Sequence, residues 1–474
     1  MEKIESPVGA NDLQPVLLEI PEPVGAAANR QDDGRIETEE SQGAVRLRQP
    51  QRHQMEMRVQ CPDDLVAADH PVRLVAAVVE RLDIKKFCEP IRAREGVVGR
   101  DATDPGLLIG LWLYACMRGI GSAREVARRC EESTPFLWLC GGVSVNHRLL
   151  SDFRTDHGQA LDQLLTQVIA SLVEQGVVKV SRISQDGVRV RVGAGAASFR
   201  REERLQKLLE ESRQHVQALR EQLDAPETLD KVKAKQVARQ KRRAEEKQKR
   251  LEQAMAQLPE LKQKQEEAAK RAGKGKCGQK IREKQLRVST TDPEARVMKM
   301  ANGGFNPAAN VQLAADTVSR AIVGVEVSNE GYDAAGLSEP MRQQVEQRTG
   351  GKVEQHLVDG GYLRMQDIEE AHEQGVELFV PAKPAKNKAN RGREWEPKPG
   401  DSEAILAWKK RMSSAEGKEI YKQRAATSET VNGDLRTHRG LTQILVRGAS
   451  KTKCVALWCA LAYNVMHFGT KLLQ

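Results

Sequence analysis

The chain has 474 residues, of which 39% are hydrophobic and 30% charged, and Lys and Arg outnumber Asp and Glu by 75 to 66. This length allows two or three domains, and the net charge of +9 favours a polyanionic partner without requiring one. The sequence has no run of 18 apolar residues and no secretory signal, so we expect no membrane span and no secretion. Its eight cysteines form neither a CxxC pair nor a zinc-binding spacing, so we expect a protein of the reducing cytosol without structural zinc.

The first part of the chain contains two different patterns. Residues 1–58 are polar, with several prolines, glycines and glutamines, and we expect a mostly disordered arm. In residues 59–175 the apolar side chains recur at helical spacing, which predicts a helical N-terminal domain. Asp104 before Pro105 is typical of a helix start, and Ser122 three residues before Glu125 predicts a capping box at the start of a further short helix.

The middle of the chain changes abruptly from strand to charged helix. Val177–Val192 is rich in valine with alternating polarity, which predicts the first strand. Residues 199–272 consist almost entirely of Lys, Arg, Glu, Gln, Leu and Ala, and Pro226 interrupts their apolar stripe. We expect two helices in an antiparallel coiled-coil hairpin, the second ending near Pro259; a bent, charged helix without a partner is the alternative. The cations from Lys231 to Arg250 fit either contacts with a DNA backbone or a solvated helix face.

The remaining sequence alternates between strand and helix patterns. A basic linker with glycines at 273–280 leads to a predicted β-hairpin formed by Asn310–Asp316 and Ala321–Val327. A lysine-rich insertion occupies residues 383–418. The alternation predicts an α/β fold with a mixed sheet. The other expected elements are helix 339–348 with Ser338 as its N-cap, strand 356–359, helix 365–374, strand 376–380, helix 419–435 and helix 453–472.

Three carboxylates occupy positions that suit phosphoryl transfer. Asp186 and Asp359 end or interrupt β-like apolar runs, and Glu429 lies in a basic segment with a helical pattern. These residues offer only oxygen ligands, which magnesium prefers, and a pair of such ions can activate a water or a 3′-hydroxyl at a phosphodiester. Each also has an ordinary interpretation. Either aspartate precedes a glycine and suits a turn, and the glutamate suits an exposed helix face.

These residues, taken in order, resemble the catalytic motifs of bacterial insertion-sequence transposases of the DDE type. The resemblance covers about residues 60–474. Its first motif is Asp186-Gly187, its second is Asp359-Gly360-Gly361-Tyr362, and its third is Tyr421, Arg424 and Glu429. Further segments that resemble the family are Asp104–Arg124, Phe136–Gly142 with His147 and Phe153-Arg154, Asp292–Arg296, and Asn310–Gln312.

The resemblance implies an RNase H-like catalytic domain at residues 176–474, which contains the charged helical insertion 199–272 and the lysine-rich insertion 383–418. It implies that Asp186, Asp359 and Glu429 are catalytic and hold two Mg²⁺ ions, for which Mn²⁺ can substitute. It also implies that Tyr421, Arg424 and Arg436 contact DNA. The family often has a lysine seven residues beyond the glutamate, where this chain has Arg436, and arginine differs from lysine in shape and hydration. An ordinary surface arginine and a half-buried tyrosine remain the alternative for Arg424 and Tyr421.

The function implied is that of a DNA transposase, which cuts and joins the ends of an insertion sequence by metal-dependent phosphoryl transfer. Its partners would be double-stranded DNA, as element ends and as target, and further copies of the chain assembled on that DNA. It would act without a membrane in the bacterial cytoplasm, associated with the nucleoid, and its helical N-terminal domain would read the terminal repeats. The alternatives are a non-catalytic DNA-binding protein that retains the transposase fold and a coiled-coil assembly protein.

Overall fold

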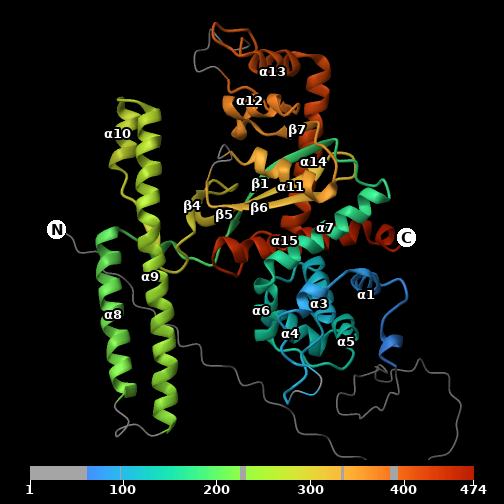
Figure 1. Ribbon diagram of the computed structural model, residues 1–474, viewed down its shortest axis with the longest axis vertical. Coiled ribbons are helices and arrows are strands. Elements are labelled where there is room, and N and C mark those ends of the chain that lie inside the picture. The colour runs from blue at the N-terminus through green and yellow to red at the C-terminus, as the bar shows by residue number, and fades with distance from the viewer. Residues whose placement is uncertain (1–60, 95, 97, 225–230, 332–335, 385–392) are drawn as a thin grey trace, which may run out of the picture. The chain divides into compact units, whose positions relative to one another are not determined.

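The structure, a computed structural model, describes residues 61–474 except 95, 97, 225–230, 332–335 and 385–392 (Figure 1). The arm expected at residues 1–58 lies outside these described residues. The sheet and the helices described below confirm an α/β fold with a mixed sheet, a helical N-terminal region and an inserted helical hairpin.

The described elements between residues 61 and 175 are all helical, as predicted. The start of α3 (Pro105–Met117) follows from its sequence, because the Asp104 carboxylate accepts hydrogen bonds from the backbone N–H groups of Gly106 and Leu107, both at 3.1 Å. The other elements are the 3₁₀ turn Pro62–Leu65 and helices α1 (Pro71–Arg81), α2 (Lys85–Cys88), α4 (Ala123–Glu132), α5 (Thr134–Cys140), α6 (His147–Asp156) and α7 (Gly158–Glu174).

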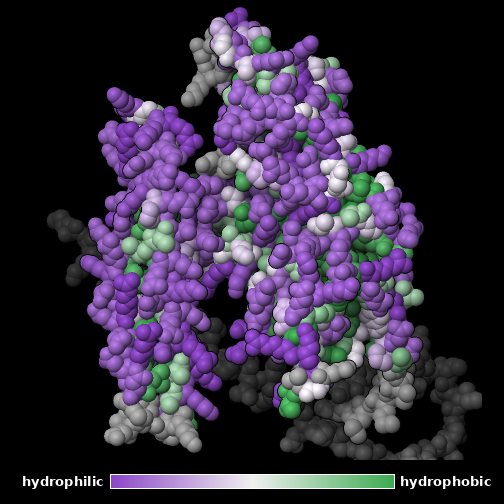
Figure 2. Space-filling model, viewed as in Figure 1, coloured by the Kyte–Doolittle hydropathy of each residue, from purple (hydrophilic) through white to green (hydrophobic). Residues whose placement is uncertain are grey.

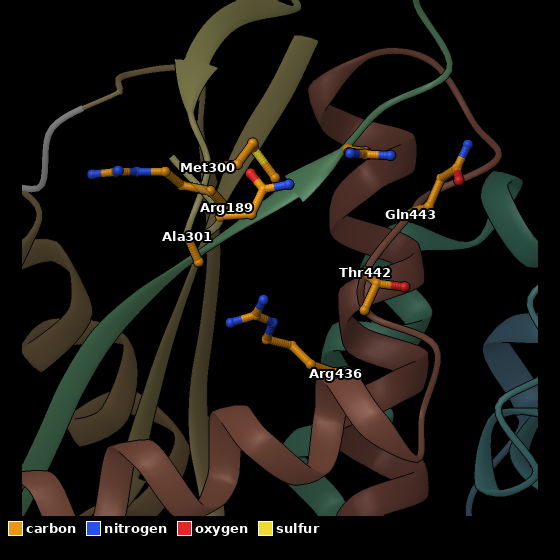
Figure 3. Close-up of a pocket in the computed structure, with 8 residues that line it drawn as sticks. Arg189, Met300, Ala301, Arg436, Thr442 and Gln443 are labelled. Atoms are coloured by element: carbon orange, nitrogen blue, oxygen red, sulfur yellow. The ribbon is translucent and has the colours of Figure 1, made fainter. Parts of the chain in front are cut away.

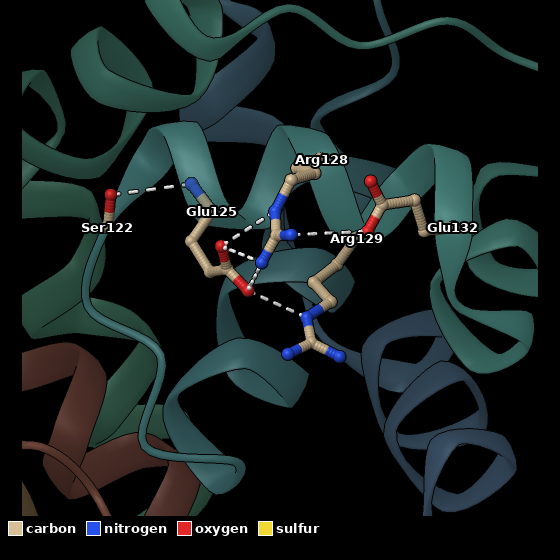
Figure 4. Close-up of polar contacts among 5 residues, drawn as sticks. All are labelled: Ser122, Glu125, Arg128, Arg129 and Glu132. Carbon is tan, nitrogen blue, oxygen red and sulfur yellow. Dashed lines mark hydrogen bonds and ion pairs between the residues drawn. The ribbon is translucent and has the colours of Figure 1, made fainter. Parts of the chain in front are cut away.

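Helix α4 forms only half of the expected capping box (Figure 4). The Ser122 hydroxyl accepts a hydrogen bond from the Glu125 backbone N–H at 3.4 Å. The Glu125 carboxylate instead accepts from Arg128 Nη2 at 2.7 Å and from Arg129 Nε at 2.8 Å. These hydrogen bonds, first from Arg129 and then from Arg128, lower the pKa of Glu125. Arg128 and Arg129 therefore belong to an ion-paired, exposed helix face.

The sheet has six strands in the order β4–β5–β1–β7–β8, with β6 paired to β5. Its pairing is mixed, because β1 is antiparallel to β5 and parallel to β7, and β7 is parallel to β8. The first strand begins at Arg182, later than the predicted Val177, because Gly176 and Val180 have positive φ angles of 70° and 51° that break the extended backbone. The strands are β1 (Arg182–Arg191), β4 (Arg296–Lys299), β5 (Phe305–Asp316), β6 (Ile322–Ser328), β7 (Gln355–Val358) and β8 (Glu377–Phe379).

One hydrophobic core joins the N-terminal helices to the sheet. Trp112 of α3, Leu161 of α7, Val190 of β1 and Trp458 of α15 (Ala449–Leu472) are all buried in it. A second core holds Trp408 of α13 (Glu403–Ser413), whose indole N–H donates to the Val380 carbonyl at 3.0 Å. Part of the lysine-rich segment 383–418 is therefore interior. The remaining helices are α11 (Ser338–Thr349), α12 (Met365–Glu373) and α14 (Ala415–Thr437).

The predicted capping of α11 by Ser338 is wrong. Leu337 is the N-cap, and Ser338 is the first helical residue. The Ser338 hydroxyl is buried and has no hydrogen-bond partner among the described residues. The chain enters this helix through an αR residue rather than through the extended conformation in which a serine caps.

The charged insertion forms the predicted antiparallel pair, α8 (Glu202–Asp224) and α9 (Lys231–Ala272). Ion pairs show the antiparallel direction, because residue numbers rise on one helix as they fall on the other: Lys262 pairs with Glu202, Arg213 with Glu252 and Arg220 with Glu245. Pro226, where the helices were expected to join, lies outside the described residues. Figure 2 shows that the visible face of both helices is mostly hydrophilic, with a few hydrophobic patches along their length.

Two predictions about the end of this insertion are wrong. Helix α9 continues through Pro259, and most of the expected linker 273–280 belongs to α10 (Lys276–Glu283). Pro259 is exposed, so its ring disturbs no core contact, while the neighbouring Leu258 is buried. Gly278 allows α10 to approach, because a Cβ there would lie 2.0 Å from the Gly273 carbonyl oxygen.

The insertion leaves and rejoins the rest of the chain at one place. The short strand β2 (Phe199–Arg200) pairs antiparallel with β3 (Val288–Ser289) and brings the two ends of the insertion together. Further along α9, Gln257 accepts a hydrogen bond from Arg296 at 2.6 Å, and Lys264 pairs with Glu330 at 2.6 Å. These contacts hold the middle of α9 against the segments around β4 and β6. Among the described helices, none is long and apolar enough to cross a membrane.

Candidate active site

Asp186 lies in the middle of β1, so the turn interpretation of this residue is wrong. It is paired with Leu313 of β5, and strand geometry continues on both sides of it. One carboxylate oxygen, Oδ1, accepts the Gly187 backbone N–H at 2.9 Å. The other, Oδ2, accepts a hydrogen bond from Asn432 Nδ2 of α14 at 3.1 Å. The side chain is therefore held between the sheet and α14.

Asp359 directly follows β7 and has two roles in the local structure. Its Oδ1 accepts the Gly361 backbone N–H and caps the 3₁₀ turn Gly360–Tyr362, so the turn interpretation is right for this residue. Its Oδ2 faces Arg424. Because Gln185 of β1 is paired with Val358 of β7, the next residues are neighbours, with Asp186 on β1 and Asp359 just past the end of β7.

Arg424 of α14 joins the two aspartates. Its Nη2 lies 3.3 Å from Asp186 Oδ2 and 3.9 Å from Asp359 Oδ2. The side chain is only 15% exposed, so this residue is not an ordinary surface arginine. Tyr421, one turn earlier, packs against the second core, and burial raises its pKa to about 12, with a smaller contribution from the charges of Asp359 and Asp186. Its phenol is therefore neutral at physiological pH and can donate a hydrogen bond.

Glu429 lies on an exposed part of α14, and its side chain lines the same cleft as the two aspartates. This cleft has a volume of about 450 Å³ and is also lined by Asn432 and Arg436. Three carboxylates that are far apart in the sequence thus meet at one cleft. They come from the middle of one strand, from the end of the next strand and from the helix that covers both.

The chemistry of this cleft suits a hard divalent cation. Its three acidic side chains offer oxygen ligands, and Nη2 of Arg424 shows that a positive group is stable within 4 Å of both aspartates. Among the described residues, however, no three His, Cys, Asp or Glu side chains lie close enough to hold one ion as they stand. A metal ion would therefore have to compete with the guanidinium for the aspartates and draw Glu429 inward.

A second, smaller cleft of about 210 Å³ adjoins the first and contains three arginines (Figure 3). Figure 3 shows Arg436 extending into it from α14 and Arg189 coming from β1. Arg191, also of β1, is the third arginine that lines it. Arg189 and Arg436 line both clefts. Sequence reasoning included Arg436 and missed the other two. The sequence did contain a signal for Arg189 and Arg191, because they are two residues apart on the strand that carries Asp186 and therefore share one face of it.

Sequence reasoning also missed the polar groups that fix α14 to β1. Besides the contact of Asn432 with Asp186, the hydroxyl groups of Ser184 and Ser428 are 2.6 Å apart, and both side chains are buried. Asn432 lies one turn after Glu429, which is a weak signal for the same helix face. No pattern in the sequence connects Ser184 with Ser428, because the two are brought together only by the fold.

Other segments quoted for the family resemblance have structural roles near the site. The Tyr362 hydroxyl donates to Gln312 Oε1, which also accepts from Gln185 Nε2 at 3.0 Å, and this links the turn after β7 to β5 and β1. Asp292 accepts the Gly448 backbone N–H at 3.1 Å, and Glu294 accepts that of Ala449. These two carboxylates cap the N-terminus of α15.

Comparison with known proteins gives two family matches. Residues 60–156 match a family described as Transposase domain (DUF772), and residues 381–468 match one described as Transposase DDE domain. The second match includes Tyr421, Arg424, Glu429 and Arg436, and neither match reaches the two aspartates. No curated protein and no solved structure matches the chain.

Proposed function

The chain is an insertion-sequence DNA transposase of the DDE type, a metal-dependent enzyme of DNA cleavage and transfer, and we propose that Asp186, Asp359 and Glu429 carry its chemistry. The observation that supports this assignment is their common cleft between β1, the end of β7 and α14. An intact set of three carboxylates argues against the alternative of a non-catalytic DNA-binding protein. The other alternative, a coiled-coil assembly protein, accounts for the α8–α9 hairpin but does not explain why three carboxylates meet at one cleft.

The three carboxylates would hold two Mg²⁺ ions, for which Mn²⁺ can substitute. Such ions, when bound, activate a water or a 3′-hydroxyl and stabilise the leaving oxygen of a phosphodiester. Before they bind, Arg424 offsets the repulsion between Asp186 and Asp359 and keeps both oriented toward the cleft. Asn432 holds Asp186 through the oxygen that also faces Arg424.

The arginines beside the carboxylates would position the DNA. Arg436, Arg189 and Arg191 present guanidinium groups at the adjoining cleft, and such groups bind phosphate oxygens in a fixed, forked geometry. Tyr421 supplies a neutral ring beside the acidic residues, so it can pack against a sugar or base without adding charge. The N-terminal helices would read the ends of the element, and several copies would assemble on one DNA.

A matched pair of variants on α14 tests this assignment. Glu429→Gln should slow cleavage of a labelled duplex bearing the element's own ends by at least about a hundredfold, since even the partners of metal ligands contribute 10–100-fold. Glu419→Gln is the control, because Glu419 is also exposed on α14 but does not line the cleft. Equal cleavage rates for the two variants would exclude Glu429 from the chemistry.

The choice of metal provides a second test of the same assignment. Cleavage should stop in excess chelator and return with Mg²⁺ or Mn²⁺, whereas Ca²⁺ should allow DNA binding with little cutting because it coordinates loosely. Binding of the duplex without cutting in every one of these metals would favour the non-catalytic alternative. Undiminished cutting in chelator would leave the three carboxylates as structural residues.

A further inference from the structure

The outer side of helix α9 carries a row of exposed cations. Its inner side is defined by Ala244 and Leu251, which are buried against α8. Successive residues of an α-helix are rotated by about 100° around its axis, so a second set of residues lies on the side of α9 opposite to these two, and four of its members are basic. We call these four residues the α9 stripe, and they are Lys235, Arg239, Arg242 and Lys249, all exposed.

The nearby carboxylates are mostly used inside the hairpin. Glu245 accepts from Arg220 of α8 at 3.4 Å and pairs with Lys241 at 3.9 Å, and Glu252 pairs with Arg213 at 3.8 Å. None of the four stripe residues forms an ion pair with another residue that the structure describes. Glu246 lies among them and offsets one charge, so the stripe remains clearly positive.

We propose that the α9 stripe binds the phosphate backbone of duplex DNA, as a contact separate from the catalytic cleft. A solvated coiled-coil face would interleave acids with its cations, whereas here Glu246 is the one acid among the four cations, and Glu245 and Glu252 pair with arginines of α8. The stripe extends over about 21 Å of helix at 1.5 Å per residue, and one DNA strand presents about six phosphates over that length. The inference rests on the proposed function, because DNA is the polyanion on which this chain acts.

The contact identifies no base sequence. Lysine and arginine side chains on an exposed helix reach phosphates rather than base edges, so the stripe would strengthen binding to any duplex and make it sensitive to salt. Gln257 and Lys264, further along α9, are fixed to Arg296 and Glu330. DNA bound on the stripe would therefore be connected to the segment that leads into the sheet.

The test compares two variants of the full-length chain with the same loss of charge. The first replaces Lys235, Arg239, Arg242 and Lys249 by Gln, which keeps helix propensity high. The control replaces four exposed cations at and just before α10 by Gln, namely Lys274, Lys276, Lys280 and Arg282, none of which forms an ion pair with a described residue. Fluorescence anisotropy measures binding of a random-sequence duplex of about 40 base pairs over a range of salt concentrations, and circular dichroism verifies the helix content of both.

The stripe variant should bind at least about tenfold more weakly near physiological salt, and the slope of log K against log salt should fall by about 3 to 4, since each phosphate contact contributes about 0.9. The control should change neither quantity by a comparable amount. Equal behaviour of the two variants would overturn the proposal. A change in oligomeric mass with unaltered DNA binding, measured by light scattering, would overturn it in favour of a protein contact.

The outcome is independent of the catalytic assignment. Metal-dependent cleavage at saturating DNA should persist in the stripe variant, because none of its four residues lines the catalytic cleft. A failure of the proposed function would appear differently, as cleavage that survives Glu429→Gln while the effect of the stripe on binding remains.

Discussion

Helices α14 and α15 follow one another and are almost equal in length, with 23 and 24 residues, but α14 places charged side chains at the candidate active site whereas α15 is buried in the core. Helix α14 buries only five residues, two of them Thr427 and Ser428. It places Arg424 against Asp186, and its Glu429 and Arg436 line the catalytic cleft. Helix α15 buries thirteen residues, most of them apolar, and joins the N-terminal helices to the sheet.

The contrast teaches that stability and chemistry are separated along this part of the chain. A helix that presents charged groups at a cleft is fixed by a few polar contacts, here Ser184 with Ser428 and Asp186 with Asn432. A helix that is apolar on most sides is fixed by burial. Variants on α14 should therefore change DNA cleavage more than stability, and variants on α15 should change stability more than cleavage.

The largest expected effect is on catalysis, from Asp359→Asn. Cleavage should fall by at least about a hundredfold, because a proposed metal ligand loses its charge. DNA binding should be retained, and so should the melting temperature, since the amide oxygen can still cap the Gly360–Tyr362 turn. Gel assays of cleavage and binding on one labelled duplex measure both. Parallel loss of binding and cleavage would contradict the role of a metal ligand.

Trp458→Ala on α15 should have the largest effect on stability. Trp458 is fully buried, and its indole N–H donates to the Arg154 carbonyl at 3.1 Å. We expect a loss of about 3–5 kcal/mol in the free energy of unfolding, measured with denaturant. Thr470→Ala, an exposed position on the same helix, should change it little. A small loss for Trp458→Ala would mean that α15 does not carry the core.

Arg424→Gln tests the link between the two properties on α14. Without the guanidinium, Asp186 and Asp359 repel each other, so the metal-free protein should lose about 1–2 kcal/mol, between the values for exposed and buried pairs. Mg²⁺ should then raise the melting temperature more in the variant than in the wild type, because no arginine competes for the aspartates. Equal metal-induced shifts would show that the ion binds elsewhere.

The smallest expected effect is a pH dependence at the start of α15. Burial raises the pKa of Asp292, so its folded form holds the proton more tightly than its unfolded form. The stability that this group contributes is therefore present at low pH and is lost as pH rises above its ordinary value of 3.8 through the raised pKa. The melting temperature of Asp292→Asn, relative to the wild type, should rise over this range. A constant difference would contradict the raised pKa.

The sequence predicted the parts of this molecule that depend on local pattern and on motif order. The β5–β6 hairpin, α4 with its Ser122 cap and the antiparallel pair α8–α9 follow from alternation, capping residues and helical periodicity. Asp186, Asp359 and Glu429 were chosen by order and element type, and the structure brings all three to one cleft. Their roles in catalysis stay predictions.

The features that the sequence did not predict are set by partners far along the chain. Pro259 was expected to end a helix, but buried neighbours keep α9 continuous. The segment 273–280 was expected to be a linker, and it folds as α10 because Gly278 allows close packing on α9. The contact of Arg424 with both aspartates forms only when β1, the end of β7 and α14 are packed together. The periodicity of apolar residues in the sequence cannot indicate such a contact.

The shared core also determines when this protein can fold during its synthesis. Helix α3 is apolar on almost every side, and α15, which helps to bury it, begins at Ala449. A ribosome adding about 5–20 residues per second needs tens of seconds to travel from one to the other. Through that interval the face of α3 that packs on α15 stays uncovered, so chaperones that bind apolar helices should meet this protein on every ribosome that makes it.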